Sequence, residues 1–309
     1  MTAHARNVAA SWVLALTAPL AACGATPPAP PAEPPPAPAL RPPPPEPELP
    51  GGGRTVLPEH RMVGFSGAPG SAALGPLHGD LDAAGQQIDR QAQDYTQNKR
   101  PLPVFELIAT RATSSPGQDG QYRARSSDST IDEHLAAARR HGAVLLLGIQ
   151  PGRADFLDEV RHYDRWLAEP DVGLALDPEW AVGPDETPGD VFGTTTGGEL
   201  NAVADHVAAI AREHSLPQKP LIYHQLSPSV VRDEQDLAPH PELALVKSMD
   251  GIGSPELKKQ AWDKLVTTKP PHVATGIKLF FQEDTRSGPL MTPPEVLGLQ
   301  PAPDYVLYE

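Results

Sequence analysis

Two carboxylates stand two residues apart where a short apolar run ends. The run Val172–Leu176 is followed directly by Asp177, Pro178, Glu179 and Trp180. Alternate side chains of a strand point to the same face, so Asp177 and Glu179 are expected to share one pocket. The charge of Asp177 should raise the pKa of Glu179, as a general acid requires. A pair of carboxyl groups beside an aromatic ring is typical of a site that cleaves glycosidic bonds.

The segment that must position this pair, residues 54–309, is close in size to a typical (β/α)8 barrel. It contains eight short apolar runs, most of them followed by a helical pattern, which predicts parallel β-α-β units and an α/β fold. A doubly wound open sheet is the alternative. We favour the barrel because residues 64–70, after the first run, lack the GxGxxG spacing of a phosphate loop.

The expected elements follow from these patterns. The expected strands are Arg61–Ser66, Val104–Thr110, Ala143–Gln150, Val172–Asp177, Leu221–Leu226, Ala244–Asp250, Gly276–Gln282 and Tyr305–Glu309. The expected helices are Leu81–Lys99, Ile131–His141, Ala154–Ala168, Glu199–His214, Pro255–Val266 and a short one near Pro294–Leu299. The sequence ends with the eighth strand, so we expect a barrel that lacks its last helix.

The pleat of each strand then separates residues that face the barrel axis from those that face the helices. Polar side chains gather on the inward face, most of them near the carboxyl ends of their strands, where barrel enzymes keep their active sites. The predicted inward residues are Ser66, Glu106, Gly148, Gln150, Asp177, Glu179, Tyr223, Gln225, Ser248, Asp250, Lys278 and Gln282. His224 is expected to face the helices as a core histidine.

The polar and aromatic side chains at this end of the barrel have expected roles in catalysis or in substrate binding. Asp250 and Glu106 are candidates for the base or nucleophile that acts with Glu179 and Asp177. Lys278 could form a Schiff base, as in barrel aldolases, but a salt bridge to Glu106 or Asp250 is the preferred interpretation. The remaining candidates would bind substrate, by ring stacking or by hydrogen bonding. These substrate-binding candidates are Trp180, Tyr223, Phe281, Gln150, Gln225, Gln282 and Lys278.

A barrel whose fourth strand ends in Asp-x-Glu resembles several glycoside hydrolases, among them the chitinase-like and lysozyme-like barrels. In the chitinase-like group the Glu is the acid, the Asp assists it, and the acetamido group of the substrate is the nucleophile. The resemblance implies that Glu179 is the acid and Asp177 its assistant. The longer DxxDxDxE motif is not matched, since Ala175 stands at one of its Asp positions. In the commoner retaining hydrolases a strand-7 Glu is the nucleophile, and Gln282 is expected to be inward there instead.

The first residues read as an export signal. Residues 1–22 contain an apolar segment too short to span a bilayer, and the tetrapeptide Leu20-Ala21-Ala22-Cys23 resembles a bacterial lipobox. We therefore predict an exported lipoprotein, anchored to the outer face of the cytoplasmic membrane through a lipid on Cys23, the sole cysteine. An ordinary signal peptide with a chance cysteine is the alternative. Residues 23–53, rich in Pro, Ala and Gly, are predicted to form a disordered tether.

Composition narrows the partners further. The formal net charge is −14, from 25 basic and 39 acidic residues, which argues against a nucleic-acid surface. No HxH, HExxH or paired-cysteine spacing occurs, so no metal and no other cofactor is expected. No GxSxG elbow occurs, which excludes an α/β-hydrolase triad. An acidic exported domain suits a neutral partner such as a polysaccharide or cell-wall glycan.

Two functions remain open. The first is a glycoside hydrolase that acts on cell-wall or environmental polysaccharide by carboxylate acid/base catalysis. The second is a non-catalytic carbohydrate- or wall-binding lipoprotein on a degenerate hydrolase barrel. Two expectations support it: Gln282 at the position where a nucleophile would be expected, and the missing last helix.

Overall fold

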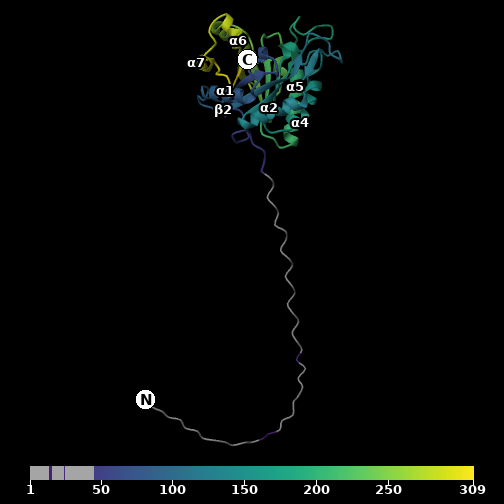
Figure 1. Cartoon of the computed structure of the whole chain (residues 1–309), viewed down its shortest axis with the longest axis vertical. Helices are drawn as coiled ribbons and strands as arrows, with labels where there is room; N and C mark the ends of the chain where they lie inside the picture. The colour runs from purple at the N-terminus through teal and green to yellow at the C-terminus, as the bar shows by residue number, and fades with distance from the viewer. Residues whose placement is uncertain (1–13, 16–23, 25–44) are drawn as a thin grey trace, which may run out of the picture. The chain divides into compact units, whose positions relative to one another are not determined.

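Eight parallel strands close into a barrel, as the sequence predicts. Their order around the barrel is β1, β2, β4, β5, β7, β9, β10 and β11, and β1 pairs with both β2 and β11 to close it. Figure 1 shows the strands surrounded by helices. The fold is a (β/α)8 barrel, and the doubly wound alternative is excluded. The bounds are His60–Gly67, Arg100–Ala112, Val144–Ile149, Val172–Leu176, Lys219–Gln225, Leu243–Met249, Ala274–Leu279 and Tyr305–Tyr308, in the same order.

This computed structural model describes residues 14, 15, 24 and 45–309. The predicted signal peptide, the predicted lipidation site Cys23 and most of the predicted tether lie outside these residues. None of the helices among the described residues is long and apolar enough to cross a membrane.

The helices match the amphipathic patterns of the sequence. One difference is the expected helix over 154–168, which is divided into α3 and α4 by a turn at His162 and Tyr163. No helix follows β11 within the described chain. The helices are α1 Leu81–Gln93, α2 Asp128–Arg140, α3 Phe156–Arg161, α4 Asp164–Leu167, α5 Gly197–Glu213, α6 Pro255–Val266 and α7 Pro293–Leu297.

The helix starts follow ordinary capping chemistry. Asp80, Ser127 and Ser254 occupy N-cap positions, and their side chains accept hydrogen bonds from backbone N–H groups of the first turn of α1, α2 and α6. At the start of α5, Thr196 and Glu199 form a reciprocal capping box. These caps fix the residue at which each of the four helices begins.

Short 3-10 helices and short extra strands lie at the carboxyl end of the barrel. All of them lie in segments that lead from the carboxyl end of a barrel strand to the next helix or strand. They are η1 Ala72–Leu74, β3 Arg123–Arg125, η2 Pro178–Trp180, β6 Thr195–Thr196, β8 Val231–Arg232, η3 Glu234–Asp236 and η4 Asp284–Arg286. The carboxyl end of the barrel is therefore the elaborated face, where barrel enzymes keep their sites.

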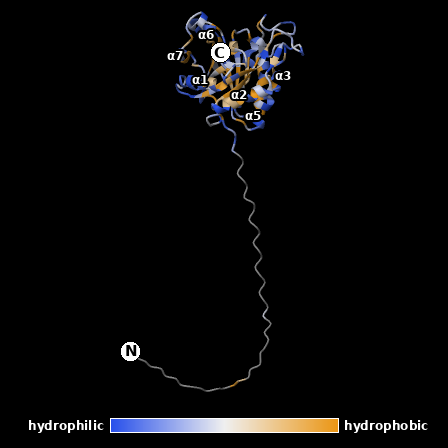
Figure 2. Cartoon of the chain, in the orientation of Figure 1, coloured by the Kyte–Doolittle hydropathy of each residue, from blue (hydrophilic) through white to orange (hydrophobic). Residues whose placement is uncertain are grey.

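Two apolar clusters hold the barrel together. The larger lies between the strands and the helices, and the smaller fills the interior near the amino ends of the strands. Figure 2 shows apolar residues concentrated on the strands and the inner sides of the helices. The interior cluster includes Leu49, which is only 3% exposed, and Val56, which is fully buried. The compact unit thus begins at Pro45 rather than at residue 54, because Leu49 packs into the barrel.

Candidate carboxylate site in the barrel interior

Above the interior apolar cluster, the barrel holds a layer of polar and charged side chains. Strand registers place Glu106 of β2 beside Ser66 of β1, and His224 of β7 beside Ser248 of β9. Hydrogen bonds and ion pairs then connect side chains that lie on, or directly after, seven of the eight barrel strands. The connected residues are Glu106, Gln150, Asp177, His224, Asp250, Lys278, Tyr305 and Glu309.

His224 is the centre of this layer. Its Nδ1 lies 2.7 Å from Oδ1 of Asp250, and its Nε2 lies 3.4 Å from Glu106. Burial alone would lower the pKa of His224, but the charges of Asp250 and Glu106 outweigh it and raise that pKa well above its ordinary value. His224 is therefore a buried imidazolium that bridges two carboxylates.

The prediction for β7 was wrong by one residue, because His224 faces the barrel axis and its neighbours Tyr223 and Gln225 do not. Tyr223 and Gln225 were expected to face the axis, but Tyr223 belongs to the helix-facing cluster, and its hydroxyl donates to Oε1 of Glu234 at 2.6 Å. Gln225 is fully buried, and its Nε2 donates to the backbone oxygen of Ser227 at 3.1 Å. The run 219–225 is apolar or amphipathic on both faces, so its alternation does not distinguish them. One argument from the sequence could have identified His224 as an inward residue. Two carboxylates that are buried together, Asp250 and Glu106, need a cation between them.

A second prediction fails after β10. Gln282 was expected to be inward, but β10 ends at Leu279 and Gln282 lies exposed in the turn that follows. The strand ends early because Asp284 accepts a hydrogen bond from the N–H of Phe280 at 2.9 Å, which curls the chain away from the sheet. Neither Gln282 nor Glu283 therefore occupies the strand-7 nucleophile position, and the last inward residue of β10 is Lys278.

Asp177 and Glu179 do lie together at the end of β5. Asp177 is 5% exposed, and its Oδ2 accepts a hydrogen bond of 3.0 Å from Nε2 of Gln150, as an interior position of both residues predicts. Glu179 is half-buried in η2, beside half-buried Trp180. The buried Oε2 of Glu179 has no hydrogen-bond partner among the described residues. Glu179 therefore retains an oxygen that is free to carry or deliver a proton.

The environments of the carboxyl groups push their pKa values apart. Burial raises the pKa of Asp177 to about 6, with smaller contributions from the charges of Glu106 and Asp250. Burial first, and then the charges of Asp177 and Asp250, raise the pKa of Glu179 well above its ordinary value. The predicted direction for Glu179 is confirmed, although burial is a larger cause than the neighbouring charge.

The other two carboxyl groups shift the opposite way. Burial would raise the pKa of Asp250, but the cations His224 and Lys278 outweigh burial and lower that pKa below its ordinary value. Burial would also raise the pKa of Glu106, but the same two cations and the hydroxyl of Tyr305, which donates to its Oε2 at 2.5 Å, together lower that pKa. The interior thus combines two carboxyl groups that favour the proton with two that remain ionised.

Lys278 forms ion pairs and is not a free amine. Its Nζ lies 3.6 Å from Asp250, which confirms the predicted salt bridge, and 2.6 Å from Glu309, a partner that the sequence did not suggest. Although burial lowers the pKa of Lys278, the charges of Glu309 and Asp250 raise it well above its ordinary value. A Schiff-base role needs a neutral amine, so this environment opposes it.

One group of side chains in the described part of the chain could in principle hold a metal ion. Asp177, His224 and Asp250 offer ligand atoms that all lie within 4.8 Å of one another. Nδ1 of His224 is already hydrogen-bonded to Asp250, and the ammonium of Lys278 lies beside the same carboxylate. These contacts favour an ion-paired arrangement of this group over a metal centre.

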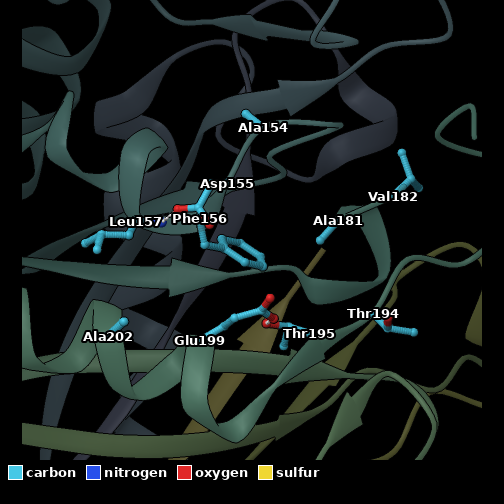
Figure 3. A pocket seen from close by; sticks show the side chains of 10 residues that line it. All are labelled: Ala154, Asp155, Phe156, Leu157, Ala181, Val182, Thr194, Thr195, Glu199 and Ala202. Carbon is cyan, nitrogen blue, oxygen red and sulfur yellow. Dashed lines mark hydrogen bonds between the residues drawn. The ribbon is translucent and has the colours of Figure 1, made fainter. Parts of the chain in front are cut away.

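A cavity of about 210 Å³ lies near the site but does not include its acids. It is formed between the starts of α3 and α5 (Figure 3), where Phe156 and Ala181 face Thr195 and Glu199. Glu199 is already engaged in the capping box, so this cavity offers little unused hydrogen-bonding capacity. We assign it no role in the site.

Exposed apolar side chains mark the same end of the barrel as the acids. From residue 45 onward, every large apolar residue that is strongly exposed follows the carboxyl end of β5, β9 or β10. These residues are Val191, Phe192, Ile252, Leu257 and Phe281. The exposed apolar groups of the described chain from residue 45 onward are thus found at the elaborated face.

Comparison with known proteins does not assign the chain to a family, because no family model matches it and no curated protein matches it significantly.

Proposed function

We propose that the barrel is a glycoside hydrolase in which Glu179 is the general acid. The observation that carries the proposal is the divergence of pKa values within one interior, upward for Glu179 and Asp177 and downward for Asp250 and Glu106. Carboxyl pairs whose environments separate their pKa values are the usual source of an acid and a base at neutral pH. Glycoside hydrolysis needs such a pair.

Each residue then has a distinct part in the reaction. Glu179, protonated at neutral pH, gives its proton to the glycosidic oxygen as the bond to the leaving sugar breaks. Asp250, kept ionised by His224 and Lys278, acts at the opposite face as the base or nucleophile. Asp177, oriented by Gln150, helps to maintain the high pKa of Glu179 through its charge, so that the acid can regain its proton after each turnover.

Glu106 has a supporting part. It is 2% exposed, and both its contacts, Tyr305 and His224, are interior residues. Tyr305 is the first residue of β11 and belongs to the apolar cluster that fills the interior. Its hydrogen bond therefore holds Glu106 deeper in the barrel than Asp177 and Glu179. We assign Glu106 the role of holding the imidazolium of His224, which in turn holds Asp250.

The substrate class follows from the face around the site. Trp180 and Phe281 can stack on sugar rings, and the net charge of −14 disfavours polyanions. We infer a neutral polysaccharide. If Cys23 is lipidated and the chain exported, as the sequence predicts, wall glycans would be the nearest such polymers.

The test is a product assay on the full chain and its Glu179→Gln variant. Both would be incubated with a panel of wall and plant polysaccharides, and the released sugars would be measured by mass spectrometry. The exchange keeps the shape of the side chain and removes its proton donor, so we expect products from the parent only. Glu133→Gln, on the exposed face of α2, is the matched control and should hydrolyse like the parent. Equal hydrolysis by Glu179→Gln would refute the assignment.

The second candidate is non-catalytic glycan binding. It is favoured by the burial of Asp177, Asp250 and Glu106, none of which is more than 7% exposed, and by the ion pairs that His224 makes with the last two. An interior that satisfies itself in this way could be purely structural. This alternative predicts saccharide binding that survives Glu179→Gln, with no product from either protein.

A further inference from the structure

A second cavity, of about 340 Å³, opens at the carboxyl end of the barrel between the segments that follow β1 and β10. Its volume lies at the lower end of the range of ligand pockets, which suits a single ring rather than an extended ligand. The polar and aromatic side chains that line it are His78, Phe281, Gln282, Glu283, Arg286 and Glu309.

Phe281 is a fixed aromatic surface in this cavity. One face of its ring stacks on Tyr308, with a centroid distance of 5.2 Å and an interplanar angle of 22°, and its edge meets Phe65 at 5.9 Å. The hydroxyl of Tyr308 is itself hydrogen-bonded to that of Tyr95 at 2.6 Å. Nevertheless Phe281 remains 37% exposed. The ring is thus supported from behind and open in front.

The turn that carries Phe281 is held from several sides. The N–H of Phe281 donates to the backbone oxygen of Glu309 at 2.7 Å. The carboxylate of Asp284, 1% exposed, accepts from the N–H groups of Phe280 and Gly253, both at 2.9 Å. Lys258 lies 3.0 Å from the same carboxylate. An aromatic ring on so constrained a turn loses little freedom when it binds a ligand.

The charged side chains of the cavity are neutralised within the protein. Arg286 lies 3.5 Å from Glu283, and Glu309 lies 2.6 Å from Lys278. The cavity therefore offers an aromatic face and several hydrogen-bonding groups without a net charge. This combination fits a neutral hexopyranose, which has apolar C–H faces and a rim of hydroxyl groups.

The cavity also borders the acids. Glu309 lines it, and the same carboxylate contacts Lys278, whose Nζ is 3.6 Å from the proposed base Asp250. A ring in the cavity is thus separated from Asp250 by the ion pair between Glu309 and Lys278. We propose that the cavity is a subsite that binds a neutral hexopyranose unit of the glycan, stacked on Phe281 and adjacent to the unit that is cleaved. The term subsite rests on the proposed hydrolase function, whereas binding itself does not.

The test measures binding and not turnover, so that it remains informative if hydrolysis fails. The full chain carrying Glu179→Gln would be titrated calorimetrically with the trisaccharides of N-acetylglucosamine and of β-1,4-glucose. Phe281→Ala in that background should weaken binding of at least one trisaccharide roughly tenfold, and Phe281→Tyr should retain it within about twofold. Phe192→Ala, which removes a ring that is 72% exposed in the segment after β5, is the matched control and should bind like its parent.

Several outcomes would overturn the subsite. They are unchanged affinity in Phe281→Ala, an equal loss in Phe192→Ala, or no binding of either sugar at millimolar concentration. Because Phe281 packs against Tyr308 and Phe65, the alanine variant could unfold. The ring resonances of Phe281 in the parent therefore provide a second measurement: they should shift when the trisaccharide is added, and their constancy would contradict the proposal. Binding as described, without products from the parent chain, would refute the hydrolase and leave a binding site.

Discussion

Asp177→Asn is predicted to stabilise the fold at neutral pH. The folded protein raises the pKa of Asp177 from 3.8 to about 6, so the folded state holds this proton more tightly than the unfolded state does. Stability therefore falls as the pH rises between these two values, because only the unfolded chain ionises freely. One pKa unit corresponds to about 1.4 kcal/mol, which makes the cost above pH 6 about 3 kcal/mol. Asparagine does not ionise and avoids this cost.

The geometry suits the exchange. The amide oxygen of the new asparagine can keep the hydrogen bond from Nε2 of Gln150. We expect the free energy of unfolding in urea to rise by about 2–3 kcal/mol at pH 7 and by only about 0.5 kcal/mol at pH 4. For a domain of this size the gain corresponds to a rise in Tm of roughly 4–12 °C.

Asp250→Asn is the matched comparison, since it changes the same residue type in the same interior. The pKa of Asp250 is lowered, so its ionised form contributes stability that is present above the unfolded pKa and is lost as the pH falls. Its exchange should destabilise the protein by about 3–5 kcal/mol at pH 7, because His224 and Lys278 lose a buried partner. Equal effects of Asp177→Asn at both pH values, or changes of the same sign in both variants, would refute the reasoning.

Three further predictions concern the same interior and its walls. His224→Gln should lower the free energy of unfolding by about 3–5 kcal/mol at pH 7, because two buried carboxylates lose their shared cation; a loss below about 1 kcal/mol in urea would contradict this. In Asp177→Asn the alkaline limb of any hydrolytic pH profile should move to lower pH, since the charge that helps to raise the pKa of Glu179 is gone; a limb that stays in place would argue against Glu179 as the acid. Gly64→Ala should cost about 3 kcal/mol or more in thermal unfolding, because its Cβ would lie 1.9 Å from the carbonyl oxygen of Val104, whereas Gly79→Ala, with no atom within 4 Å, should change stability by less than about 0.5 kcal/mol.

The barrel was predictable because each strand is a continuous apolar run with turn residues around it. Alternation also placed Glu106, Gln150, Asp177, Asp250 and Lys278 inside correctly, since these polar residues interrupt otherwise apolar inward faces. The burial of Asp250 and Glu106 beside cations, and hence the lowering of their pKa values, depends on contacts across the barrel that local spacing does not encode.

The errors have the same origin. On β7, polar and apolar residues occupy both faces, and only the pairing with β9 decides that His224 is inward. After β10, the hydrogen bond between Phe280 and Asp284 ends the strand, a contact over four residues that an apolar run cannot reveal. The ion pair of Lys278 with Glu309 joins neighbouring strands at the barrel mouth. Hydrogen bonds and ion pairs between side chains therefore determine the site, whereas the pattern of apolar residues determines the fold.

The proposed mechanism requires Glu179 to carry a proton at neutral pH while Asp250 does not. The most direct measurement is a ¹³C-detected NMR titration of the side-chain carboxyl carbons, assigned with Glu179→Gln and Asp250→Asn. We predict that Glu179 titrates well above the ordinary Glu value of 4.5 and Asp250 below the ordinary Asp value of 3.8. Ordinary pKa values for both groups, or an ionised Glu179 beside a protonated Asp250, would contradict it.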